Sequence, residues 1–241
     1  MRGAMKGSNG HIGTVILDLD GTLVDSAVDL ARASDLLLGE HGLAAIGVAG
    51  TRRLIGHGIA NLVDQALSSR GVKLDAQGLS AATERFKVLY AQCIPDGSVL
   101  YPGVREALAE LQAAGWRLVV CTNKLEAFSR TILDALGIGG FFDIVAGPDT
   151  FGVAKPDPAH LVNTLPQGKL TAGHAAIMVG DSEVDIATAR AAGIPVIAMS
   201  YGYAKAPLAT LKPDAVADSF SRVPALVARL TTEQAVAIGG R

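Results

Sequence analysis

The sequence contains few cysteines and almost no net charge. Of its 241 residues only Cys93 and Cys121 are cysteines, too few and too far apart for a disulfide framework. No Cys/His cluster has the spacing of a zinc site. We therefore expect a protein of the reducing cytoplasm. The 21 basic and 23 acidic side chains give a formal net charge of −2, which argues against a nucleic-acid partner bound on a basic face.

Long apolar runs are missing as well. No stretch reaches the roughly 18 consecutive apolar residues that a membrane-spanning helix needs. The basic opening segment leads into VILDLD, where Asp18 and Asp20 would interrupt the apolar core of a secretory signal. We therefore expect neither secretion nor a membrane partner. Apolar residues make up 49% of the chain and charged residues 18%, which is typical of a globular protein.

From residue 100 onward, short β-branched runs alternate with amphipathic helical stretches. With an earlier run at 15–18, they predict strands at 117–121, 142–146, 176–179, 195–199 and 215–217. Helices are predicted after residue 102, over 125–136 and over 184–192. This repetition indicates an α/β fold with a doubly wound, mainly parallel sheet, the Rossmann-like arrangement, covered on both faces.

A long helical insertion follows the first predicted strand. Roughly a hundred residues separate that strand from the next, many more than a crossover needs. We predict a helical cap, residues 25–99, inserted into a core made of 11–24 and 100–225, with helices over 28–38, 59–67 and 81–93. Asp25-Ser26 and Tyr101-Pro102-Gly103 are the expected hinges. The cap should lie over the edge where such sheets bind ligands, and we expect frayed ends at 1–10 and 232–241.

The motif DLDGT ends the first predicted strand. Because side chains alternate along a strand, Asp18 and Asp20 can point to the same side. Two buried carboxylates repel one another, and a divalent cation relieves that repulsion. Gly21 and Thr22 then form a turn whose backbone N–H groups could bind phosphate oxygens. Taken alone, the motif is equally consistent with a solvated acidic turn.

A second acidic motif, GDSEVD, follows the strand predicted at 176–179. Asp181 ends that strand and Asp185 lies near the N-terminus of the next helix. Together with the first pair, Asp181 completes an oxygen-only set of ligands suited to Mg²⁺. In the alternative interpretation, Ser182 or Asp181 is a helix N-cap and the other acids interact with the helix dipole.

Two further polar groups follow expected strand ends. Thr122-Asn123 comes directly after RLVVC, and Lys155-Pro156 lies in a loop after FDIVAG. The first pair could simply cap a helix, and a lone lysine is most often a solvated surface charge. If they converge on the carboxylates and a metal, the hydroxyl, the amide and the ammonium form a site for phosphoryl transfer.

Taken in chain order, DLDGT, TN, KP and GDSEVD resemble the four motifs of the haloacid dehalogenase-like superfamily, in its phosphatase branch. The resemblance spans about residues 14–225, and the insertion occupies the place where many of these enzymes have a mobile cap. It implies that Asp18 is the nucleophile and Asp20 the general acid and base. It also implies that Thr122 and Lys155 are phosphate ligands.

The cofactor implied by this resemblance is Mg²⁺. Its ligands would be Asp18, Asp181 and the backbone carbonyl of Asp20, with Asp185 as a supporting acid. The residue types agree with the chemistry, because a carboxylate can attack phosphorus and give an aspartyl-phosphate that water then hydrolyses.

Within the superfamily the chain is similar to the phosphoglycolate phosphatases, through segments such as TNK, LIGHGIANLVDQAL and GDSEVDIATARAAGIPVIAMSYGY. This similarity implies a Mg²⁺-dependent phosphomonoesterase whose small phosphorylated substrate is 2-phosphoglycolate. The alternatives are a phosphatase for a sugar phosphate, a nucleotide or pyrophosphate, and a phosphomutase. A receiver module that uses the aspartyl-phosphate as a signal is a non-enzymatic alternative. The sequence leaves the oligomeric state open.

Substrate-binding residues are expected in both parts of the chain. In the core, the turn at Gly21 could bind the phosphate through its backbone N–H groups. The resemblance implies that Asn123 contacts the phosphate or positions its neighbours. In the cap, a substrate carboxylate needs a cationic or N–H-rich contact, and Arg52, Arg53 and His57 in RRLIGHG are the candidates, Arg53 and His57 foremost. Each of these three, taken singly, is more often part of a solvated helix end.

Overall fold

The computed structural model describes residues 11–171 and 174–239 of the chain. Its core is a six-stranded parallel sheet with the order β5-β4-β1-β6-β7-β8. The strands are β1 (Gly13–Leu17), β4 (Trp116–Cys121), β5 (Ile144–Ala146), β6 (Ala175–Gly180), β7 (Val196–Met199) and β8 (Ala215–Ala217). Each predicted strand is present, with ends within two residues of the prediction. The doubly wound parallel sheet is thus confirmed.

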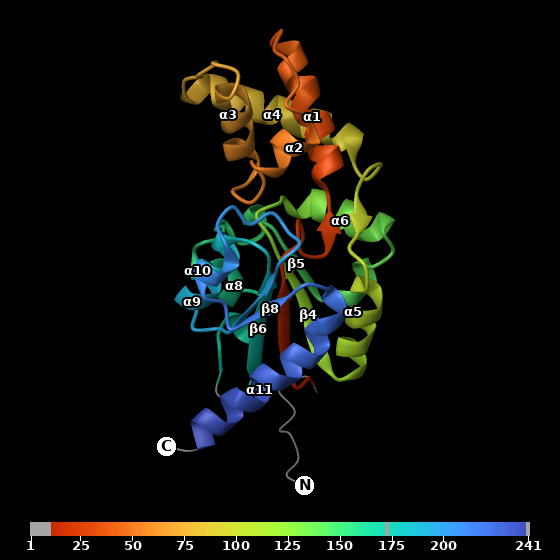
Figure 1. Cartoon of the computed structure of the whole chain (residues 1–241), viewed down its shortest axis with the longest axis vertical. Coiled ribbons are helices and arrows are strands. Elements are labelled where there is room, and N and C mark those ends of the chain that lie inside the picture. Colours follow the sequence, from red (N-terminus) through yellow and green to blue (C-terminus); the bar gives the residue numbers. More distant parts are fainter. Residues whose placement is uncertain (1–10, 172–173, 240–241) are drawn as a thin grey trace.

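Helices cover both faces of this sheet (Figure 1). Because side chains alternate along a strand, Val15 and Leu17 join the core cluster that includes α5, α6 and α11, whereas Ile16 joins the cluster that includes α8 and α9. The helices are α5 (Val104–Ala113), α6 (Glu126–Ala135), α7 (Pro148–Phe151), α8 (Pro158–Val162), α9 (Glu183–Ala191), α10 (Leu208–Leu211) and α11 (Val223–Gly239). Three 3₁₀ turns are η1 (Gly139–Phe141), η2 (Pro166–Gly168) and η3 (Phe220–Arg222).

The inserted segment forms a helical layer at one end of the sheet (Figure 1). It contains α1 (Ala27–Glu40), α2 (Gly47–Arg52), α3 (Ile59–Ser68) and α4 (Ala76–Cys93). Their apolar faces pack on one another in a separate cluster around Leu37, Leu62 and Phe86. The three long helices were predicted. The short α2 was not, since GVAGTR contains two glycines and no apolar periodicity.

Two very short strands connect this layer to the core. β2 (Val24–Asp25) pairs with β3 (Val99–Leu100) in an antiparallel ladder, where the chain enters and leaves the insertion. Strands of two residues carry no readable alternation, so the sequence did not predict them.

The C-terminal segment is helical through Gly239. α11 therefore includes most of 232–241, for which we expected a frayed end, and Val223, Val227 and Leu230 anchor it to the core. Residues 1–10, the other expected frayed end, and residues 240–241 lie outside the described residues. Within the described ranges, no helix is both long and apolar enough to cross a membrane.

Candidate active site

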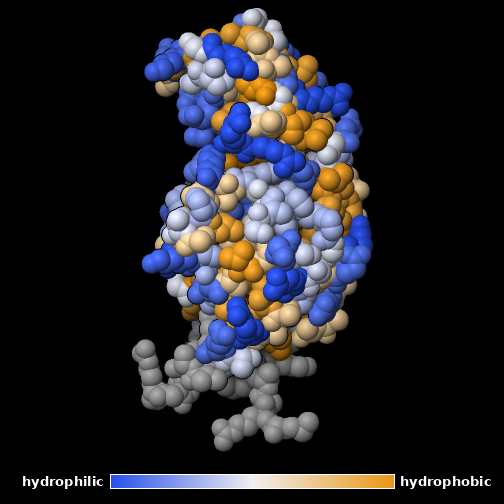
Figure 2. Space-filling view, viewed as in Figure 1, coloured by the Kyte–Doolittle hydropathy of each residue, from blue (hydrophilic) through white to orange (hydrophobic). Residues whose placement is uncertain are grey.

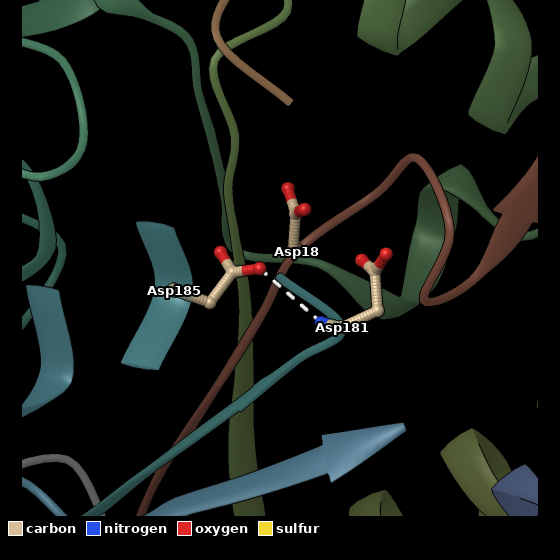
Figure 3. A group of neighbouring side chains, drawn as sticks. All are labelled: Asp18, Asp181 and Asp185. Carbon is tan, nitrogen blue, oxygen red and sulfur yellow. Dashed lines mark hydrogen bonds between the residues drawn. The ribbon is translucent and has the colours of Figure 1, made fainter. Parts of the chain in front are cut away.

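Three buried carboxylates meet at the carboxyl ends of β1 and β6 (Figure 3). The strand register aligns Leu17 with Val179, so that Asp18 and Asp181 follow neighbouring strands at the same edge. Asp185 comes from the first turn of α9. One oxygen from each of the three carboxylates lies within 4.8 Å of the others. The structure thus brings Asp18 of the first acidic motif together with Asp181 and Asp185 of the second, whereas the carboxylate of Asp20 lies outside this group.

Within this cluster, Asp185 is held by hydrogen bonds from Ser182 and Asp181. Its Oδ2 accepts hydrogen bonds from the Ser182 hydroxyl at 2.6 Å and from the backbone N–H groups of Ser182 and Asp181 at 3.0 and 3.2 Å. Ser182 is also the N-cap of α9. The N-cap interpretation of GDSEVD is confirmed for Ser182. The other oxygen of Asp185, Oδ1, faces the ammonium of Lys155. That oxygen accepts a hydrogen bond from Lys155 Nζ at 2.6 Å.

The cluster has an excess of negative charge. Lys155 Nζ also lies 2.9 Å from Asp18 Oδ1, so one ammonium faces three carboxylates. Burial, and then the charge of Asp185, raise the pKa of Asp18 to about 6 although Lys155 opposes the shift. Burial and the charges of Asp185 and Asp18 likewise raise the pKa of Asp181. Two uncompensated negative charges on oxygen ligands fit a divalent cation.

The orientation of Asp181 is set by its neighbours. It accepts hydrogen bonds from the Thr22 hydroxyl at 3.0 Å and from the Tyr203 backbone N–H at 2.6 Å. Gly21 has φ +86°, and a Cβ there would lie 2.3 Å from Asp181 Oδ2, so only glycine fits. The N–H of Gly21 donates to Val24 and that of Thr22 to Leu19. The turn itself therefore takes up the donors expected for phosphate, and the visible role of Gly21 is to leave room for Asp181.

A second ion pair holds Asp20. Its Oδ2 lies 2.8 Å from Lys124 Nζ, and its Oδ1 accepts a hydrogen bond from the Ser26 hydroxyl at 2.5 Å. Lys124 Nζ also donates to the Tyr90 hydroxyl of α4 at 2.8 Å. Burial alone would lower the pKa of Lys124, but the charge of Asp20 and the hydrogen bonds to Asp20 and Tyr90 raise it above the usual value.

The sequence alone did not predict a role for Lys124. Its one signal is its place directly after Thr122-Asn123, and a lone lysine is ordinarily a surface charge. Only 5% of Lys124 is exposed, and its contact with Tyr90 joins residues 34 positions apart. That contact depends on how the cap helix α4 packs over the core.

The remaining core candidates surround one cavity. Asn123 uses its amide within the protein: Nδ2 donates to the backbone oxygens of Lys155 at 3.0 Å and Gly56 at 3.2 Å, and Oδ1 accepts from the Lys155 N–H at 2.9 Å. It thereby positions the loop that carries Lys155. The core residues lining the cavity are Asp18, Asp20, Thr122, Asn123, Lys124 and Lys155.

The inserted helical layer lines the other side of this cavity with apolar side chains and glycines, namely Leu30, Ile55, Gly56, Gly58, Ile59 and Leu62. His57 lines an adjoining hollow with Asn123 and Lys155. Arg53 lines a different hollow with Tyr203 and Lys205, and Arg52 is paired with Asp25. The structure therefore places His57 beside the site and Arg53 away from the cavity that holds the carboxylates.

This arrangement can be compared with known proteins. A family model described as haloacid dehalogenase-like hydrolase matches residues 12–193. The chain belongs to this family. Among curated relatives of this hydrolase, the phosphoglycolate phosphatase of Mesorhizobium japonicum is 42% identical over 208 residues, which are 86% of this chain and 90% of that protein. The phosphoglycolate phosphatase of Caulobacter vibrioides is 39% identical, covering 91% and 92%.

A solved structure shares most of the fold of this hydrolase. It is the crystal structure of a predicted phosphoglycolate phosphatase from Haemophilus somnus, which has a TM-score of 0.81 and is 31% identical. The match covers 89% of this chain and 97% of that one. The superfamily predicted from the four motifs is thus confirmed.

Proposed function

We propose that this hydrolase is a Mg²⁺-dependent phosphatase that converts 2-phosphoglycolate and water to glycolate and phosphate. The observation that carries the proposal is the placing of Asp18 and Asp20 on one cavity, each with its own buried ammonium partner. The names of relatives that are 42% and 39% identical support this choice of substrate.

In the first half-reaction, a carboxylate oxygen of Asp18 attacks phosphorus and the bond to the ester oxygen breaks. Asp20 gives its proton to the departing glycolate oxygen. In the second half-reaction, Asp20 takes a proton from water, and that water hydrolyses the aspartyl-phosphate. Thr122 and Lys155 contact the phosphoryl oxygens, where the Lys155 charge offsets the developing negative charge.

Asp18, Asp181 and the backbone carbonyl of Asp20 would hold Mg²⁺, with Asp185 supporting them through Lys155 and the Asp181 N–H. When bound, the cation neutralises the charge that keeps an anionic phosphate away from an anionic nucleophile. Oxygen-only ligands and an excess of two negative charges favour Mg²⁺ over softer metals.

Residues 25–99 act in this proposal as a cap that opens for exchange and closes over the substrate. The core consists of 11–24 and 100–225, and the hinges are Asp25-Ser26 and Tyr101-Pro102-Gly103, beside the short ladder of β2 and β3. A closed cap excludes water from the first half-reaction. The small cavity lined by cap and core suits a small phosphorylated substrate.

The test is phosphate release from 2-phosphoglycolate beside sugar phosphates, nucleotides and pyrophosphate, with Mg²⁺ and then with a chelator. We expect a metal-dependent preference for 2-phosphoglycolate of tenfold or more, equivalent to about 1.4 kcal/mol. Equal or faster release from another phosphate would overturn the substrate, and release that persists without metal would overturn the cofactor.

A further inference from the structure

Lys124 is a buried cation that pairs with Asp20 but takes no part in either half-reaction. Lys124 lies on the cavity beside Asp18, Asp20 and Lys155, and 3% of its side chain is exposed. Its ammonium has three N–H donors, of which Asp20 takes one and Tyr90 another. One donor is left for a group in the cavity.

The position of Lys124 relative to Asp20 indicates which part of the substrate its free N–H can bind. Asp20 delivers its proton to the ester oxygen of the substrate, so this oxygen must lie within hydrogen-bond distance of Asp20. Lys124 Nζ lies 2.8 Å from Asp20 Oδ2 and is therefore next to the leaving group rather than to the phosphoryl oxygens. In 2-phosphoglycolate a single methylene separates the ester oxygen from the carboxylate, which brings that carboxylate within reach of Lys124.

The other lining groups do not offer this charge. Among the described residues around the cavity, the cations are Lys124 and Lys155, and Lys155 is engaged by Asp18 and Asp185. The cap side of the cavity is apolar, so a carboxylate that enters it loses water and needs a charged partner.

We propose that Lys124 is the specificity-determining residue of this enzyme and that its third N–H binds the carboxylate of the leaving group. The class of substrate is a phosphomonoester whose alcohol carries a carboxylate one carbon from the ester oxygen. Resting on the proposed function, this inference adds the residue that selects the substrate. It assigns to the core a contact that the sequence suggested for Arg53 or His57 of the cap.

Tyr90 is the positioning residue in this proposal. It is fully buried in α4, its hydroxyl accepts from Lys124 Nζ, and the ammonium lies 4.7 Å from its ring centroid. The edge-to-face contact with Phe128 of α6, at 5.2 Å between centroids, fixes the ring between cap and core. The cap thus holds the recognition group in place when it lies over the site.

The test compares kcat/KM for 2-phosphoglycolate with that for ethyl phosphate, which has the same chain length and no carboxylate. In the wild type, 2-phosphoglycolate is preferred. In Lys124→Met that preference falls roughly 10- to 100-fold, the worth of a charge-assisted hydrogen bond, mainly through KM for 2-phosphoglycolate. Lys73→Met, at an exposed lysine of the cap, is the control and keeps the wild-type preference.

Tyr90→Phe keeps the ring and removes the hydroxyl, so it provides a second reading if Lys124→Met fails to fold. We expect a smaller, several-fold loss of preference, again in KM for 2-phosphoglycolate. Equal losses for both substrates in these variants would overturn the proposal, because they would mean that Lys124 acts only by holding Asp20. A wild type without any preference would overturn the proposed substrate as well, and the wild-type measurement alone reveals that case.

Discussion

At the scale of single residues, the site consists of buried carboxylates and ammonium groups that compensate one another's charge. Asp18 and Asp185 share Lys155, while Asp20 is paired with Lys124. A buried ion pair is costly to desolvate, and removal of one partner leaves the other uncompensated. Such an arrangement contributes little to stability in itself, so its geometry is explained by chemistry rather than by folding.

The charge of Asp18 opposes folding when no metal is bound. Its pKa is raised from 3.8 to about 6, so the carboxylate costs stability above that pH, and the cost disappears as the pH falls below about 4. In Asp18→Asn, Lys155 keeps Asp185 as its partner. In chelator, at about pH 7.5, this substitution should therefore raise the free energy of unfolding by up to about 3 kcal/mol. At about pH 5 the gain should be smaller.

Thermal melts with chelator and with Mg²⁺ check this prediction. Mg²⁺ should raise the Tm of the wild type more at about pH 7.5 than at about pH 5, because protons compete for the carboxylate. Asp18→Asn should lose most of that rise, whereas Asp218→Asn, far more exposed, should keep it. An Asp18→Asn protein that is less stable than the wild type in chelator would contradict this account of the charge.

At the scale of elements, polar contacts of Asp29 join the two ends of the inserted segment. Asp29 in the first turn of α1 accepts hydrogen bonds from the Gly97 N–H at 2.7 Å and from the Ser98 hydroxyl at 2.6 Å. These contacts tie the start of the first cap helix to the chain just before β3. The two ends of the insertion are thereby held together beside β2 and β3.

Asp29→Ala should therefore destabilise the protein strongly. The buried Ser98 hydroxyl and the half-buried Gly97 N–H lose their acceptor, and the free energy of unfolding should fall by about 2–4 kcal/mol in urea denaturation. The matched control is Asp96→Ala, whose exposed ion pair with Arg32 should contribute less than about 1 kcal/mol. Equal effects of the two substitutions would show that the contacts of Asp29 with Gly97 and Ser98 do not stabilise the connection between the ends of the insertion.

The elements differ in how far the sequence predicts them. The strands of the parallel sheet are buried on both faces, so each is an apolar run and could be read directly. Since parallel strands end at one edge, the convergence of Asp18, Thr122 and Asp181 followed from that reading. β2 and β3 were not readable because their pairing is set by the cap and the core rather than by two residues of sequence.

At the scale of the whole molecule, the site lies between two separately packed units. The sheet has a hydrophobic cluster on each face, and α1–α4 pack around a third. In the view of Figure 2 the molecule narrows between the sheet and the inserted helices, and hydrophilic side chains gather at this junction. The Tyr90 contact of Lys124 spans this junction, as does the bond from the Tyr203 hydroxyl to Asp25 at 2.7 Å. Contacts of this kind depend on how two units dock, which no local pattern in the sequence reveals.

The proposed mechanism requires that Asp18 becomes covalently phosphorylated. Trapping the aspartyl-phosphate on the protein tests this step directly. Asp20→Asn should be mixed with 4-nitrophenyl phosphate, whose leaving group departs without a general acid, and Mg²⁺, quenched in acid within the first turnover, and digested for mass spectrometry. We predict a phosphoryl group on the peptide that contains Asp18, since the variant lacks the base that activates water. A phosphoryl group on another residue, or phosphate release by Asp18→Asn at the wild-type rate, would contradict the account.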